Sequence, residues 1–335
     1  MRRRLPATLT FLAMSLAACS SGPSAHERPK VWAVAIHGGA GTLDKQASPD
    51  KRGEYELALT QALAYAKDHL ARGEAAIDVC EAVVRMLEDD PHFNAGKGAV
   101  FNEKGEHELD ASIMDGSTLR CGAVAGVRTV RHPIALARLV MEKTRHVLLA
   151  GDGAELFADG QKVERVDNRW FDTEARRQVL DEVLQERART GALLPPDPRQ
   201  TYGTVGCVVM DMHGHLAAAT STGGLTGKRW GRVGDSPLIG AGNYADAWAA
   251  VSCTGTGEQF IRHAVGRSLT ARLQFGGQTL DQAARAIVFD TLQKDDGGLI
   301  AVDRHGNLAA VFNSQGMYRA LADSAGRFTV RIFED

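Results

Sequence analysis

A threonine placed directly before an apolar run has the clearest capacity for chemistry in this chain. Thr204 follows Gly203 and precedes the apolar segment 205–210. A threonine hydroxyl is a weak nucleophile without an adjacent base, and the nearest base is its own α-amine, which is free only at a chain terminus. That amine has a pKa of about 7.7–8.0, so a useful fraction is neutral at physiological pH. Cleavage after Gly203 would therefore create an N-terminal nucleophile, although Gly-Thr is also a common way to begin a strand.

Two glycine-rich stretches offer groups that such a nucleophile needs. Residues 220–224, Thr-Ser-Thr-Gly-Gly, follow one hairpin later and offer hydroxyls that can lie beside Thr204. Residues 252–258, Ser-Cys-Thr-Gly-Thr-Gly-Glu, form a small turn that enters a helix. Backbone N–H groups at such a turn are good donors to an oxyanion. A phosphate-binding loop is disfavoured there, because no lysine follows at the spacing that it requires.

A third glycine-rich stretch carries opposite charges. In residues 231–237, Gly-Arg-Val-Gly-Asp-Ser-Pro, Arg232 and Asp235 lie three positions apart. A guanidinium can bind the α-carboxylate of an amino acid in bidentate fashion, and a carboxylate can bind its α-ammonium. The alternative interpretation is a surface ion pair, which is common and contributes little to stability.

The first half of the chain predicts the elements that would position these groups. Residues 31–36 read as a buried strand that leads into a loop at 37–41, and 121–127 as a second strand. Helical spacing predicts helices over 55–70, 77–87 and 134–141, and a further helix over 179–184 that Asp172 would cap. Residues 190–198, with three prolines in the last four positions, cannot continue that helix. We expect a mobile linker over about 185–203.

The second half is richer in strands. Segments 205–210 and 216–220 flank a turn at Asp211-Met-His-Gly, and 300–303 and 308–312 flank a similar turn at Asp303-Arg-His-Gly. Two hairpins of one design predict antiparallel sheets that face each other, with helices over 260–273 and 280–292 covering them. The order of elements favours layered α+β packing.

Composition and the N-terminus narrow the protein class. A net charge of −2 and the absence of a basic patch with interleaved aromatics argue against nucleic-acid binding. Residues 1–18 have a basic start, a short apolar stretch and a small-residue end, which predicts an export signal and thus a periplasmic protein. Cys19 after Leu-Ala-Ala resembles a lipoprotein cleavage box, and 20–29 read as a flexible tether, so 19–30 would carry any lipid anchor. An ordinary cleaved signal with an incidental Cys19 remains the alternative.

The remaining cysteines show no pattern of their own. They are widely spaced in apolar runs, which is typical of buried small hydrophobic residues rather than of a disulfide framework or a metal site. They are Cys80, Cys121, Cys207 and Cys253.

From residue 31 to its end the chain resembles the plant-type L-asparaginase/isoaspartyl peptidase family, the threonine members of the N-terminal nucleophile (Ntn) hydrolases. The resemblance rests on the combination of many short motifs. These are His37-Gly-Gly-Ala-Gly41, Phe93-Asn-Ala-Gly96 with Gly98, Glu108-Leu-Asp-Ala111, Met114-Asp-Gly116, Gly203-Thr-Val-Gly206, Gly231-Arg-Val-Gly-Asp-Ser-Pro237, Ser252-Cys-Thr-Gly-Thr-Gly257 and Gly316-Met-Tyr318.

The resemblance implies an α+β fold, a four-layer αββα sandwich autocleaved into an α subunit (31–203) and a β subunit (204–335). It implies hydrolysis of β-aspartyl (isoaspartyl) dipeptides and L-asparagine through a covalent ester on Thr204, with no cofactor needed for catalysis. It also implies a dimer of cleaved heterodimers, an (αβ)2 heterotetramer. Thr204 would be the nucleophile in both reactions, and Thr222 would bind its hydroxyl.

The resemblance also assigns the substrate-binding groups. Arg232 would bind the α-carboxylate and Asp235 the α-amine, while Thr254 and the Gly255 N–H form the oxyanion hole and Gly257 lines the pocket. Relatives hold a structural sodium ion on loop carbonyls. The counterpart loop here contains Glu88, Asp89, Phe93, Asn94, Ala95 and Lys97.

Some positions depart from the family pattern or invite another role. Gly227 and Trp230 stand where relatives often have asparagine and proline, which leaves the leaving-group preference open. His37 could act as a general base, but the Thr204 amine already supplies one, so we expect His37 to be structural. Asp110 and Asp115 are expected to be hydrogen-bonded supports.

Two rival functions remain. The first is a glycosylasparaginase-like hydrolase, whose members usually carry Asp-Thr-Ile-Gly at the cleavage site in place of Gly203-Thr-Val-Gly206. The second is an uncleaved, lipid-anchored binding protein on the same scaffold.

Overall fold

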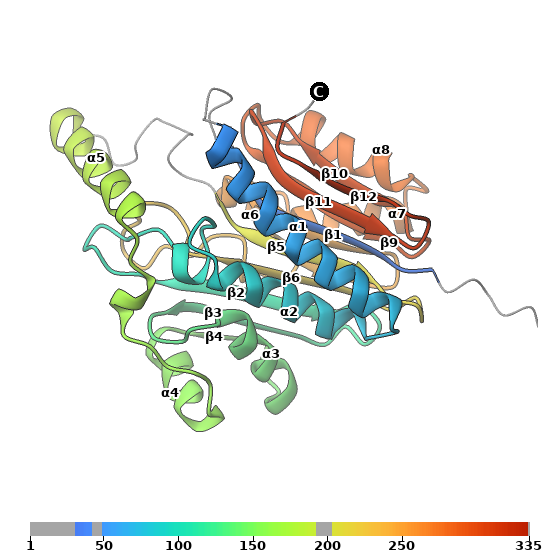
Figure 1. Cartoon of the computed structure of the whole chain (residues 1–335), viewed down its shortest axis with the longest axis horizontal. Coiled ribbons are helices and arrows are strands. Elements are labelled where there is room, and N and C mark those ends of the chain that lie inside the picture. Colours follow the sequence, from blue (N-terminus) through green and yellow to red (C-terminus); the bar gives the residue numbers. More distant parts are fainter. Residues whose placement is uncertain (1–30, 42–48, 192–202, 334–335) are drawn as a thin grey trace, which may run out of the picture.

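The computed structural model describes residues 31–41, 49–191 and 203–333. The predicted signal segment 1–18, the tether 19–30 with Cys19, and the part of the predicted linker at 192–202 lie outside these residues. Within the described residues the chain forms two β-sheets and the helices that cover them (Figure 1). No helix in these ranges is long and apolar enough to cross a membrane.

The larger sheet has eight strands in the order β12-β11-β1-β5-β6-β2-β3-β4. Neighbours are antiparallel except β3 and β4, which pair in parallel. The strands are β1 (Ala33–Ala40), β2 (Leu109–Asp115), β3 (Cys121–Val127), β4 (Leu148–Ala150), β5 (Val205–Met210), β6 (Leu216–Thr222), β11 (Met317–Asp323) and β12 (Phe328–Arg331).

The smaller sheet has four antiparallel strands in the order β10-β9-β8-β7. They are β7 (Asn243–Ala245), β8 (Ala249–Gly255), β9 (Gly297–Asp303) and β10 (Leu308–Phe312). A buried cluster joins the sheets, with Ala35 and Val208 from the larger one packed among Ala250, Ile300 and Val302 of the smaller. Both predicted hairpins, β5–β6 and β9–β10, are therefore confirmed, as is the α+β class.

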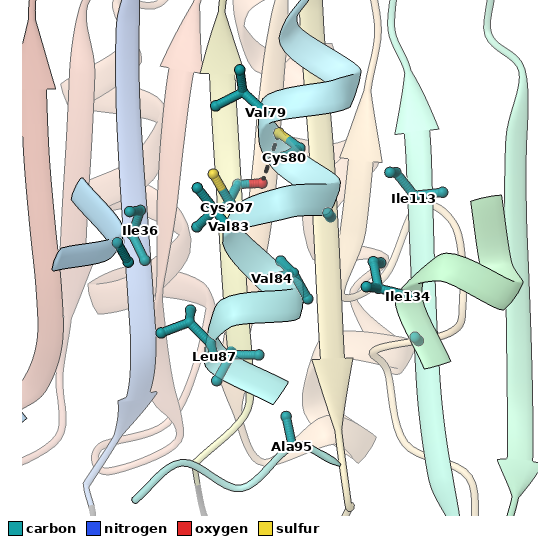
Figure 2. Packing of buried hydrophobic residues seen from close by; sticks show 14 of the residues in the cluster. Ile36, Val79, Cys80, Val83, Val84, Leu87, Ala95, Ile113, Ile134 and Cys207 are labelled. Carbon is teal, nitrogen blue, oxygen red and sulfur yellow. Dashed lines mark hydrogen bonds between the residues drawn. The ribbon is translucent and has the colours of Figure 1, made fainter. Parts of the chain in front are cut away.

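Helices of the first half pack on the larger sheet. They are α1 (Pro49–Ala71), α2 (Ala76–Asp89), α3 (Pro133–Lys143) and α4 (Gly151–Gln161), with short 3-10 turns at Gly96–Gly98 and Asn168–Phe171. The apolar residues of α2 recur at helical spacing, so Val83, Val84 and Leu87 all reach the sheet (Figure 2). The Cys80 thiol donates to the Cys207 carbonyl oxygen at 3.5 Å, which joins α2 to β5.

The helices on the smaller sheet are more broken than the sequence predicts. They are α6 (Gly257–Arg262), α7 (Val265–Gln274), α8 (Leu280–Arg285) and a π-helical turn at Ala286–Thr291. The predicted helix 260–273 is interrupted because Ala264 has a φ of +44°, a left-handed conformation that cannot continue a right-handed helix. The predicted helix 280–292 exists but widens in its second half.

Helix α5 (Glu174–Thr190) corrects two boundaries. Its N-cap is Thr173, whose side chain accepts from the Arg176 N–H, rather than Asp172. It ends at Gly191, which takes the left-handed conformation that helix ends favour. The predicted linker from about 185 is therefore helical up to Thr190.

The segment His37–Ala40 is strand rather than the predicted loop. It continues β1 but carries a β-bulge, because the register against β11 shifts between His37 and Gly39. A Cβ on Gly38 would lie 2.3 Å from the Phe93 ring, so only glycine fits the bulge. The bulge brings β1 close to the start of β5, where the predicted nucleophile lies.

Candidate active site

Thr204 lies at the N-terminal end of β5 and is nearly buried, with 9% of its surface exposed. Its hydroxyl donates to Thr222 Oγ1 at 3.1 Å, and that oxygen also accepts from the Gly224 N–H at 3.0 Å. The two threonines meet because β5 and β6 form a hairpin whose open end holds both. The prediction that hydroxyls of 220–224 lie beside Thr204 is thus confirmed.

The peptide before Thr204 is held by Asn94. The Asn94 N–H donates to the Gly203 carbonyl oxygen at 3.2 Å. Its side chain is fixed in turn, because the amide nitrogen donates to the Gly224 carbonyl at 2.8 Å and the amide oxygen accepts from the Val100 N–H at 2.9 Å. A Cβ on Gly203 would lie 2.8 Å from the Asn94 Cβ. The sequence placed Asn94 only in an ion-binding loop and missed this contact.

A small pocket opens at Thr204. It combines three of the predicted groups with the nucleophile pair, since Arg232, Asp235 and Gly255 line it with Thr204 and Thr222. Gly255 has a φ of +145°, and a Cβ there would lie 1.9 Å from the Asp296 carbonyl oxygen. Only glycine therefore fits at this position beside the Asp296 backbone. The lining residues are Thr204, Thr222, Gly224, Leu225, Arg232, Gly234, Asp235, Ser236 and Gly255.

Thr254 and Gly257 lie just behind this lining. Thr254 is fully buried on β8, and its hydroxyl oxygen accepts from the Ala40 N–H at 3.1 Å. A Cβ on Gly257 would lie 2.7 Å from Asp235 Oδ1 and 2.9 Å from Arg232 Nη2. Gly257 thus leaves room for the two charged side chains rather than contacting the pocket itself.

The predicted charge pair is present, but Arg232 has a partner that the sequence did not reveal. Its Nε and Nη2 donate to the two carboxylate oxygens of Glu258 at 3.0 and 2.9 Å. This bidentate pair orients the guanidinium and leaves its Nη1 edge for a ligand. Glu258 lies in the first turn of α6, and Arg232 lies on a separate loop. The contact between them therefore depends on how α6 packs against that loop.

Asp235 is buried and poised to accept a cation. Burial raises the pKa of its carboxyl to about 7, although the charge of Arg232 acts in the opposite direction. Its Oδ2 is buried and has no hydrogen-bond partner within the described part of the chain. A buried carboxylate oxygen in a pocket, without a partner, fits an ammonium group of a ligand.

The three residues expected to be supports do make structural contacts. His37 Nδ1 lies 2.9 Å from the Thr204 carbonyl oxygen and its Nε2 2.8 Å from Ser252 Oγ. Burial lowers the pKa of His37 to about 3, so its ring is neutral. Asp110 accepts from the Gly126 N–H, and burial raises its pKa. Asp115 accepts hydrogen bonds within its own turn.

In the loop expected to hold an ion, backbone carbonyl oxygens lie close to two glycines. A Cβ on Gly96 would lie 2.1 Å from the Glu88 carbonyl oxygen, and one on Gly98 would lie 2.4 and 2.2 Å from those of Pro91 and Phe93. The side chains have other partners: the Glu88 carboxylate accepts from Ser221 Oγ, Asp89 pairs with Arg131, and Lys97 donates to the Trp170 carbonyl. Among the described residues no group of three His, Cys, Asp or Glu could hold a metal.

The cysteines take no part in this site. Cys80, Cys207 and Cys253 are free and buried, while Cys121 is free and partly buried. Their expected role as small hydrophobic residues is confirmed for the first three.

The chain belongs to the asparaginase family, whose pattern matches residues 30–332. The curated relatives are named for peptide and amide hydrolysis. The chain is 48% identical to the isoaspartyl peptidase of Salmonella typhimurium over 308 residues, which covers 90% of this chain and 98% of the relative. It is 47% identical to the isoaspartyl peptidase of Escherichia coli, covering 90% and 96%. It is 44% identical to a probable isoaspartyl peptidase/L-asparaginase 2 of Arabidopsis thaliana, covering 90% and 99%.

Proposed function

We propose that this chain is a self-cleaving threonine amidohydrolase that hydrolyses β-aspartyl dipeptides and L-asparagine. One observation carries the proposal: Thr204, hydrogen-bonded to Thr222, shares a pocket with Arg232, Asp235 and Gly255. A nucleophile, two charges for an α-amino acid and a backbone N–H suit an aspartyl unit attacked at its side-chain carbonyl. The names of the relatives support the same substrate class.

Autocleavage would precede catalysis. The Thr204 hydroxyl oxygen attacks the Gly203 carbonyl carbon and its proton passes to the Thr204 nitrogen. The C–N bond to Thr204 breaks, and the acyl group moves to the threonine oxygen. Water then hydrolyses this ester, which leaves a carboxylate on Gly203 and a free amine on Thr204. The Asn94 N–H, which donates to the Gly203 carbonyl oxygen, is placed to stabilise the negative charge that develops there. The products are an α subunit (31–203) and a β subunit (204–335) of a four-layer αββα Ntn hydrolase.

In the mature enzyme the Thr204 amine acts as the base. It takes the hydroxyl proton as Oγ attacks the side-chain carbonyl carbon of the substrate. Thr254 and the Gly255 N–H stabilise the oxyanion, and the amine returns the proton to the leaving nitrogen. The remaining β-aspartyl ester on Thr204 is hydrolysed by water. Throughout, Arg232 binds the α-carboxylate and Asp235 the α-ammonium.

The same proposal includes a structural ion, an assembly and a location. The carbonyls of Glu88, Pro91 and Phe93 suit a sodium ion, which prefers oxygen ligands, and such an ion would stiffen the loop that holds Asn94. We also propose a dimer of cleaved heterodimers, and export to the periplasm with a lipid on Cys19. These parts rest on the family and on the N-terminal sequence alone.

The test is an intact-mass measurement under denaturing conditions, followed by assays on the purified protein. We expect two chains split after Gly203, release of aspartate from a β-aspartyl dipeptide and slower release from L-asparagine. A glycosylated asparagine serves as the competing substrate. Turnover of that compound alone would replace the proposal with a glycosylasparaginase-like activity, and a single uncut chain without activity would favour a binding protein.

A further inference from the structure

One segment of β1, from His37 to Ala40, contacts both the predicted nucleophile and the oxyanion threonine. His37 contacts the Thr204 carbonyl, Ala40 donates to the Thr254 hydroxyl, and a Cβ on Gly39 would lie 2.5 Å from the Gly203 Cα. The segment is irregular, because the bulge at Gly38 interrupts its register with β11. It thus links the nucleophile on β5 with the oxyanion threonine on β8.

The contacts of His37 form a directed chain of hydrogen bonds. The Thr204 carbonyl can only accept, so Nδ1 carries the ring proton and Nε2 is the acceptor. Ser252 Oγ, 2.8 Å from Nε2, must therefore donate to the ring. Its oxygen is then free to accept from Thr220 Oγ1 at 2.7 Å. Thr220, Ser252 and His37 each donate once, so the chain runs from β6 in the larger sheet through β8 in the smaller sheet and back to β1 and the start of β5.

The geometry excludes a role for His37 in proton transfer. Both ring nitrogens are used, one by a carbonyl and the other by Ser252, and the hydroxyl of Thr204 is bonded to Thr222 instead. Burial lowers the pKa of the His37 ring to about 3, so the ring is neutral near neutral pH and keeps this direction of hydrogen bonding.

We propose that His37 is a positioning residue: through the Ser252–Thr220 chain it fixes the Thr204 carbonyl, and with it the direction of the Thr204 amine and hydroxyl. The inference rests on the proposed function, since it concerns how that nucleophile is aligned. His37 would align the reacting atoms of Thr204 and would not bind the substrate. A displaced nucleophile lowers the rate even when the substrate still binds.

Two substitutions at His37 separate the two contacts. In His37→Asn the amide nitrogen takes the place of Nδ1, so the bond to the Thr204 carbonyl is kept and that to Ser252 is lost. In His37→Gln the amide reaches the place of Nε2, so Ser252 keeps its partner and the Thr204 carbonyl loses its donor. We expect His37→Gln to lower both the rate of autocleavage and kcat about 100-fold, with KM unchanged, and His37→Asn to lower them about tenfold or less.

Two variants away from His37 test the same inference if His37→Gln does not fold. Ser252→Ala and Thr220→Val remove the distant links of the chain, and we expect each to lower kcat about threefold to tenfold with KM unchanged. Thr270→Val is the matched control, because Thr270 is a fully buried threonine on the outer helix α7. It should leave kcat within about twofold.

The outcomes separate this inference from the proposed function. Wild-type protein that neither cleaves nor hydrolyses a β-aspartyl dipeptide removes the proposed function itself. Active wild-type protein with equal kcat in His37→Gln and His37→Asn, or with Ser252→Ala and Thr220→Val indistinguishable from Thr270→Val, overturns the positioning role. A rise in KM that accounts for the loss of kcat/KM also overturns it.

Discussion

The hairpins β5–β6 and β9–β10 have nearly the same turn, but only the first carries the predicted nucleophile. In the first, Asp211 Oδ1 accepts from the N–H groups of His213 and His215 at 2.8 and 3.0 Å. In the second, Asp303 Oδ1 accepts from those of His305 and Asn307 at 2.8 and 3.0 Å. The turns follow from local sequence, since in each an aspartate accepts hydrogen bonds from the backbone of its own turn and a glycine three positions later allows the chain to reverse.

The difference lies at the opposite ends of the strands. At the same distance before the turn aspartate, the first hairpin has Thr204 and the second has Asp296. Thr204 brings its hydroxyl to a pocket that Thr222 and Arg232 also line. Asp296 instead supports the glycine-rich turn: its carbonyl accepts from the Thr256 N–H and its carboxylate from the Gln293 N–H. Other elements converge on both open ends, but only the first hairpin presents a reactive side chain to the pocket.

The largest effect is expected at the nucleophile itself. Thr204→Ala has neither hydroxyl nor a route to an N-terminal nucleophile, so cleavage and hydrolysis should both be abolished, as shown by intact mass and by aspartate release. Thr204→Ser keeps a hydroxyl and should still cleave, more slowly. Cleavage of the alanine variant would show that another residue attacks Gly203.

The next largest effect is expected at Arg232. Arg232→Ala leaves the Glu258 carboxylate and the substrate α-carboxylate without their shared partner, so kcat/KM for a β-aspartyl dipeptide should fall about 100- to 1,000-fold. Glu258→Gln keeps one acceptor oxygen for Arg232 and replaces the other with an NH2 group that cannot accept, so one of the two bonds is lost and a fall of about tenfold is expected. Unchanged kinetics in Arg232→Ala would remove the assigned carboxylate contact.

A smaller effect, set by pH, is expected from Asp235. Because burial raises its pKa to about 7, the free enzyme carries a protonated, neutral Asp235 in mildly acidic solution. A neutral carboxyl cannot pair with an ammonium, and a protonated Thr204 amine, whose pKa lies at about 7.7–8.0, cannot act as the base. We therefore expect kcat/KM to rise with pH through about 7–8 and to fall about 100-fold per unit below about 7. Bound substrate favours the ionised form of Asp235, so the contribution of Asp235 to the pH dependence of kcat should lie at lower pH. Asp235→Asn should keep only the limb of the Thr204 amine, so its kcat/KM should fall about tenfold per unit.

The smallest effects should come from the turns, and they sharpen the contrast between the hairpins. Asp211 is fully buried and its Oδ2 also accepts from the Ala76 N–H at the start of α2, at 3.0 Å. We expect Asp211→Ala to lower the free energy of unfolding by about 2 kcal/mol and Asp303→Ala by about 1 kcal/mol. Denaturant titration measures both. Equal losses would mean that the α2 contact contributes no more than the bond from Asn307 Nδ2 to Asp303 Oδ2. A changed kcat in Asp303→Ala would contradict the separation of turn and site.

Much of the fold followed from local pattern. The two hairpins, the helices that became α2 and α3, and the glycine-rich stretches around Thr204, Arg232 and Thr254 were all predicted at nearly their observed places. Where prediction failed, local conformation was overridden by neighbours: His37–Ala40 pairs with β5 and β11 as a strand, and Ala264 breaks a helix that its apolar spacing favoured. The residue types at these two places do not predict either the strand or the helix break.

The sequence by itself determined which chemistry to expect, because a threonine after glycine, a charge pair and a glycine-rich turn are each common alone but together resemble one family. Only the tertiary structure decided which groups support them. Asn94 at the Gly203 carbonyl, Glu258 on Arg232 and Ser252 on His37 are contacts between residues far apart along the chain or on different elements. Hydrogen bonds of this kind require the donor and the acceptor to be placed to within a fraction of an ångström. That placement exists only after the two sheets and their helices have packed.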